Sequence, residues 1–266
     1  VTAEMFDYAF QTSACGDLFT YTKNVAHIQC VPNPSEVTCV SATEPPECKT
    51  AVKILVNQPT IPSDWGIGSE HSSFELTVGA DVETIEENPF LVGWTSASKV
   101  KNVTFSSSPP GPSPPPPLTI GRGAFQKMAT QRPLIIAGLN RDVVLDISAF
   151  SSGRFTSADL RSVVSIGNWS FYFVPLVRVI FGNKLTLIGD HAFSNCASLE
   201  EVVFPAALTS IGPGAFAYTG LKHIKFNEPF LFPVPNAAFR GTDRLETVLF
   251  TAPTAHTSAA ISSAFT

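Results

Sequence analysis

Residues 188–205 read Ile-Gly-Asp-His-Ala-Phe-Ser-Asn-Cys-Ala-Ser-Leu-Glu-Glu-Val-Val-Phe-Pro, and variants of this stretch recur along the chain. The shared skeleton is Ile or Val, four residues, Phe, then Leu, two residues, Val or Ile, one residue and Phe. Four copies in register occupy residues 166–250 at a period of 22 to 24 residues. A fixed period of this length indicates one supersecondary unit stacked on copies of itself, which is a solenoid.

Three looser copies precede these four. Ile85, Ile120 and Leu145 each have a Phe five residues later, and an insertion at residues 106–117 explains the long interval between the first two. The sequence therefore predicts seven repeat units. Each unit is too short for a full helix with two strands, so we expect short strands joined by turns or 3₁₀ pieces.

The repeat also predicts the interior. Alternation along a strand directs the last Val or Ile and the last Phe of each unit inward. The Phe that follows the Ile should point inward as well, and its copies should stack as a column of rings. Gly189 and Gly212 indicate a close backbone approach that a side chain would obstruct. The rings of the expected column belong to Phe171, Phe193, Phe216 and Phe239.

Residues 188–205 and the hexapeptide Ile211-Gly-Pro-Gly-Ala-Phe216 resemble BspA-type leucine-rich repeats. The resemblance covers residues 82–250 and is firm from residue 166 onward. It implies a mostly β leucine-rich-repeat solenoid, and members of that family are typically surface or secreted proteins that act in adhesion and binding. The family shares no catalytic residues, so the resemblance implies no active site.

The composition limits the function classes. Of the 266 residues, 44% are hydrophobic and only 15% are charged, and the net charge is −5. Nucleic-acid binding needs a basic face, so no nucleic-acid partner is expected. The longest apolar run, residues 171–181, contains Arg178 and is too short to span a bilayer. Low charge combined with 21 Phe and 22 Pro favours an extracellular protein.

Four of the five cysteines lie in the first 48 residues and lack any Cys-x-x-Cys spacing, which argues against a zinc or thioredoxin-type site. They indicate two disulfides and an oxidising compartment, and four buried thiols are the alternative. Residues 1–80 are interpreted as a disulfide-stapled cap or a small β domain, residues 81–250 as the solenoid, and residues 251–266 as a tail without a convincing cap. The clustered cysteines are Cys15, Cys30, Cys39 and Cys48.

The insertion at residues 106–117 is rich in proline and should adopt polyproline II. A serine followed by four prolines resembles the repeat of extensin-type, hydroxyproline-rich wall glycoproteins, which implies hydroxylated prolines and attached sugar. A stiff, unmodified surface loop is the alternative. Two N-glycosylation sequons begin at Asn102 and Asn168, in repeat positions that should face water. The extensin-like residues are Ser113, Pro114, Pro115, Pro116 and Pro117.

Aligning the copies stacks the outward residues of the strand motif in three columns. Charges alternate between neighbouring units, and such cross-strand pairs stabilise a stack by roughly 0.2–1 kcal/mol each. The third column presents Ile180, Val203 and Leu249 to solvent, which indicates a contact patch for another protein. Structural and partner-binding roles are both open for this face. Its residues are Val177, Arg178, Ile180, Glu200, Glu201, Val203, Lys222, His223, Lys225, Glu246 and Leu249.

No nucleophile-elbow, paired-carboxylate or metal-ligand spacing appears, and Cys196 falls in a small semi-buried slot, so neither catalysis nor a cofactor or metal is expected. The sequence predicts an extracellular structural or adhesive glycoprotein that assembles with itself, into a filament for example, or joins a surface or wall assembly. The alternative is a recognition module that binds a protein or glycan ligand through the strand face. The expected partners are protein chains, its own included, and covalent glycans.

Overall fold

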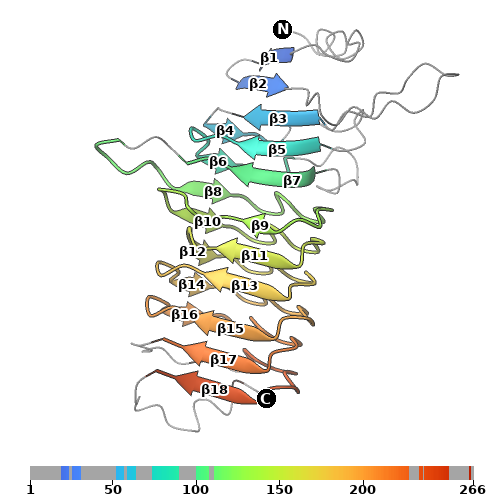
Figure 1. The fold of residues 1–266 in the computed structure, drawn as a ribbon, viewed down its shortest axis with the longest axis vertical. Helices are drawn as coiled ribbons and strands as arrows, with labels where there is room; N and C mark the ends of the chain where they lie inside the picture. Colours follow the sequence, from blue (N-terminus) through green and yellow to red (C-terminus); the bar gives the residue numbers. More distant parts are fainter. Residues whose placement is uncertain are drawn as a thin grey trace, which may run out of the picture.

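The computed structural model describes residues 19–23, 26–30, 52–56, 59–63, 74–89, 100–107, 111–227, 234–235, 237–251 and 264. Over these residues the chain forms short strands and turns, stacked coil upon coil into an elongated rod (Figure 1). No helix occurs in the part of the chain so described. The mostly β solenoid predicted from the repeat is therefore confirmed. The side chains of the four clustered cysteines lie outside the described part.

One side of the rod is a parallel sheet of seven short strands, one from each of seven successive coils. Each strand ends on a buried Ile or Leu, and the register aligns these residues from Ile61 to Ile211. The coil at Ile61 escaped sequence analysis because residue 66, five positions later, is Gly rather than Phe. In spatial order the strands are β16 (Ser210–Ile211), β14 (Leu187–Ile188), β12 (Val163–Ile166), β10 (Val143–Leu145), β8 (Leu118–Ile120), β6 (Thr84–Ile85) and β4 (Thr60–Ile61).

A second side carries the other strand of each coil, in three hydrogen-bonded groups. β13 and β15 lie in neighbouring coils, but no backbone ladder joins them. Parallel pairing begins at β3, inside the segment assigned from the sequence to a cap or small domain, and β1 and β2 extend that sheet in antiparallel fashion. The groups are β1 (Phe19–Lys23), β2 (Ala26–Cys30), β3 (Val52–Val56), β5 (Phe74–Val78) and β7 (Val100–Phe105); β9 (Leu134–Ile135), β11 (Ser157–Leu160) and β13 (Arg178–Phe181); and β15 (Glu201–Phe204), β17 (His223–Phe226) and β18 (Thr247–Phe250).

Two columns of phenylalanine rings fill the interior, and the predicted column is confirmed. Its neighbouring rings lie 5.0–5.6 Å apart between centroids with interplanar angles of 6–18°. The second column meets the first edge-on, as Phe204 meets Phe216 at 5.3 Å and 78°. Burying a ring of this size stabilises by about 1.5–3 kcal/mol before entropy is subtracted. The first column is Phe125, Phe150, Phe171, Phe193, Phe216 and Phe239, and the second is Phe181, Phe204, Phe226 and Phe250.

The turn around each ring of the first column has the same backbone in successive coils. The residues two before and two after the Phe have positive φ, as do His191 (53°) and Asn195 (63°) on either side of Phe193. Their amides and the Phe amide donate to carbonyls of the next coil, at 2.7 Å for Phe193. The close approach predicted at Gly189 is confirmed, because a Cβ there would collide with Asn168 of the preceding coil.

Arg141 ties together coils on either side of the proline-rich insertion. The insertion lies between β7 and β8, and Arg141 reaches from the loop after β9 to the loop after β5. Arg141 is only 3% exposed, and its guanidinium donates to the carbonyls of Gly79, Ala80 and Val82. Burial lowers the pKa of Arg141, and two nearby carboxylates oppose that shift. These hydrogen bonds connect the loop after β9 to the loop after β5, across the coil that holds β7 and β8.

Ala264 continues the coil pattern beyond β18. Its carbonyl accepts a hydrogen bond from Phe239 N–H at 2.8 Å, just as the Ala238 carbonyl accepts one from Phe216 N–H in the coil before. Ala264 is also fully buried. At this position, the segment assigned from the sequence to a tail therefore packs on the preceding coil as another repeat would.

Candidate interaction surfaces

The third outward column of the strand face is longer than the sequence indicated. Strand register aligns Ile135 with Asp159 and Ile180 on one group, and Val203 with Lys225 and Leu249 on the next. Ile135 is 55% exposed, Val203 38% and Leu249 54%, whereas Ile180 is half-buried. We name this set the apolar column; it comprises Ile135, Asp159, Ile180, Val203, Lys225 and Leu249.

A polar column runs beside it, two residues earlier on each strand. Arg178 and Glu201 are exposed on β13 and β15, the two strands without a ladder between them. In the described part of the chain, neither side chain makes an ion pair or hydrogen bond. His223 Nδ1 lies 2.9 Å from Thr247 Oγ1. The polar column is Ser157, Arg178, Glu201, His223 and Thr247.

The remaining column forms one of the ion pairs that the alternating charges led us to expect. Lys222 Nζ lies 2.8 Å from Glu200 Oε1, and the hydrogen bond from Lys222 holds the pKa of Glu200 below its usual value. Glu246 lies in the next coil but has no ion pair with Lys222 among the described residues. Val177 heads this column and is exposed. Both members of the single pair are solvent-accessible, so its contribution to stability is small.

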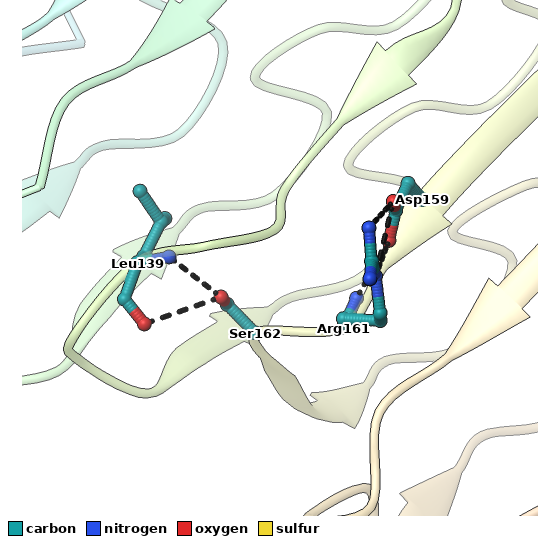
Figure 2. Close-up of polar contacts among 4 residues, drawn as sticks. All are labelled: Leu139, Asp159, Arg161 and Ser162. Carbon is teal, nitrogen blue, oxygen red and sulfur yellow. Dashed lines mark hydrogen bonds and ion pairs between the residues drawn. The ribbon is translucent and has the colours of Figure 1, made fainter.

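Asp159 on β11 forms an ion pair with Arg161, the residue after the end of that strand (Figure 2). Arg161 donates from Nε to Asp159 Oδ1 at 2.9 Å and from Nη2 to Oδ2 at 2.6 Å. Hydrogen bonding to Asp159 raises the pKa of Arg161. Beside this pair, the Ser162 hydroxyl accepts from Leu139 N–H at 3.1 Å, which joins two neighbouring coils. The charge of Asp159 is therefore partly compensated within the coil.

A second surface lies on the turns and was not predicted from the sequence. Trp169 stacks on His191 of the next coil at 4.3 Å and 20°, and Tyr172 packs edge-on against Trp169 at 4.8 Å. Phe173 and Tyr218 are more than half exposed at equivalent positions two coils apart. Trp169, Phe173 and Tyr218 all have positive φ, where bulky residues are uncommon. The positive-φ positions recur with the repeat, so alignment on the column Phe could have revealed this aromatic edge.

The predicted modification sites differ in how far they are exposed. Asn102 is half-buried on β7. Asn168 is also half-buried, and its Oδ1 accepts from Asp190 N–H of the next coil at 2.9 Å, while Ser170 of the same sequon is fully buried. Ser113 is exposed. The four prolines after it are exposed except for half-buried Pro115. Attachment of sugar at Asn168 would thus have to precede folding or leave its Oδ1 contact in place.

Cys196 lies in the core, away from these surfaces. The Cys196 thiol is buried, donates to the Phe171 carbonyl at 3.3 Å, and has its pKa raised by desolvation to about 12. In the described ranges, no three His, Cys, Asp or Glu side chains gather as metal ligands would. No helix long and apolar enough for a membrane span occurs in the residues that could be searched.

Residues 144–263 match the family model described as the BspA type leucine rich repeat region, in six copies. The chain is similar to a crystal structure of the pneumococcal vaccine antigen PcpA, with 17% identity and a TM-score of 0.40 over 81% of this chain and 51% of that one. It spans about half of that chain.

The chain is also similar to a leucine rich cell surface protein from Faecalibacterium prausnitzii A2-165, with 14% identity and a TM-score of 0.34 over 95% of this chain and 99% of that one. No curated protein matches the chain. The family match supports leucine-rich repeats as the building unit of residues 144–263.

Proposed function

We propose that this protein is an extracellular adhesive or structural glycoprotein that contacts other protein chains through its strand face. The apolar column carries the proposal. Ile135, Val203 and Leu249 are large apolar side chains that lie exposed on strands and are not buried in the core. Solenoids present extended surfaces of this kind to partners, and exposed apolar side chains interspersed with polar ones are typical of a protein contact.

The extracellular location rests on the sequence. Two sequons, the cysteine cluster and the Ser-Pro run are all typical of secreted chains. The preferred partners are further copies of the chain or proteins of a cell surface or wall, and the covalent glycans would lie at Asn102, Asn168 or the insertion. The proposal assigns the protein no catalytic step, cofactor or metal.

An adhesion assay with protein-coated beads tests the role of the face. Replacing both Val203 and Leu249 by Glu should abolish bead retention on cells or on a layer of the same protein, because charged side chains would replace two exposed apolar side chains of the apolar column. Tyr218→Glu is the matched control, since it places the same charge at an exposed apolar residue on the turns. Retention that survives the double substitution, or that falls equally with the control, would refute the proposal.

Recognition of a soluble ligand is the second candidate. The observation in its favour is that Arg178 and Glu201 have no side-chain partner in the described chain, so they remain available to a polar ligand. In this case the beads would bind only when a specific ligand is immobilised, and the free protein would show no tendency to associate with itself.

A further inference from the structure

We propose that two copies of this chain pair through the strand face about a two-fold axis that passes between β13 and β15. This inference rests on the proposed function and names its partner as a second copy. It comes from the order of side chains along the apolar column, which reads apolar, acidic, apolar, apolar, basic, apolar from Ile135 to Leu249. That order is complementary to its own reverse.

The symmetry follows from the strands. A two-fold axis that lies in the interface parallel to the strands reverses the order of the coils but leaves the strand direction unchanged. Each column therefore faces the same column of the second copy in reverse order. β13 then faces β15 of the second copy, β11 faces β17, and β9 faces β18. An isologous contact of this type makes every contact twice.

The apolar column then matches at each position. Ile180 faces Val203 of the second copy next to the axis, and Ile135 faces Leu249 at the ends. Between them, Asp159 faces Lys225, so opposite charges meet, although Arg161 already holds the carboxylate of Asp159. An axis parallel to the rod and running along the apolar column would place Lys225 against Lys225, so it is disfavoured by like charge.

The polar column supports the same axis independently. Arg178 on β13 faces Glu201 of the second copy, and by symmetry Glu201 faces Arg178. These are the two charged residues of that column for which the described chain supplies no ion pair. In the remaining column, which begins with Val177, Glu200 faces Val177 and Lys222 faces Thr156, so no like charges meet there.

The expected affinity is modest. Six strands about 4.8 Å apart, each contributing about four residues of 3.3 Å, outline a patch of roughly 24 by 13 Å on each copy. A patch of this size belongs with small, transient interfaces. Dimerisation should therefore be looked for at about 100 µM protein and low salt, where charge pairs are least screened.

Sedimentation velocity with charge-reversed variants tests the pairing. Arg178→Glu and Glu201→Arg should each weaken the dimer by about tenfold or more, because each puts like charges together at two symmetric places. An equimolar mixture of the two variants should restore dimers, and so should the double variant with both substitutions. Arg240→Glu, an exposed arginine on the turns, is the control and should leave the dimer unchanged.

Recovery in the mixture also shows that both variants are folded. A wild-type protein that stays monomeric at about 100 µM would overturn the two-fold contact, as would single variants that dimerise normally or a mixture that stays monomeric. Each of these three outcomes leaves the proposed function separately testable, because bead retention by another surface protein would still depend on Val203 and Leu249.

Discussion

Replacing Phe193 with Ala should unfold the rod far more readily than any exposed substitution in the same turn. The Phe193 ring is fully buried, stacks on Phe171 and Phe216 at 5.0 Å each, and meets Phe181 edge-on at 5.7 Å. Truncating a buried Phe to Ala costs about 3–5 kcal/mol, and each lost ring pair contributes about 0.5–1.5 kcal/mol. Because these terms overlap, we expect a loss of about 5 kcal/mol in the free energy of unfolding.

Urea unfolding followed by circular dichroism measures this loss through the shift of the transition midpoint. Phe173→Ala is the matched control, since that ring is 56% exposed and only two residues from the column position; its cost should stay within about 1 kcal/mol. Phe193→Leu keeps most of the apolar volume and should lose only about 1–2 kcal/mol. A cost for Phe193→Ala below about 2 kcal/mol, or equal to that of the control, would refute the column as the source of stability.

Three further substitutions or treatments probe other parts of the rod. Gly214→Ala should destabilise by about 1–3 kcal/mol, since φ is +63° and a Cβ would meet the His191 ring; prior replacement of His191 by Gly should reduce that cost in urea unfolding. Arg141→Met should lower the free energy of unfolding by about 3 kcal/mol, because it removes the charged donor to the buried Val82 carbonyl, whereas Arg132→Met, whose side chain is 61% exposed, should change it by less than about 1 kcal/mol. Because the folded pKa of Cys196 is about 12 and its ordinary value is 9.0, iodoacetamide at pH 9 should leave the folded thiol unlabelled and modify it in urea; labelling of the folded protein, located by peptide mapping, would contradict its burial.

The fold of the clear repeats followed from the sequence because their information is local. Apolar residues at constant spacing from Ile166 to Phe250 specify which side chains point inward, and identical units can then only stack like on like. This is why the column through Phe193 and the outward position of Val203 and Leu249 were predicted correctly. The turn aromatics were missed because the residue type at these positive-φ positions changes from coil to coil, so only alignment on the column Phe brings them together.

Only the tertiary structure decided which side chains meet across coils whose loops differ in length. Ile135 and Asp159 joined the apolar column through backbone register, since their coils lack the full motif and the connecting loops vary. Arg141 donates to the Val82 carbonyl across an intervening coil, and the spacing of the repeat does not indicate this contact. The sequence by itself thus determined which side chains of each coil point inward and which point outward. Hydrogen bonding between coils determined the order of charges along the strand face, because register depends on two segments at once.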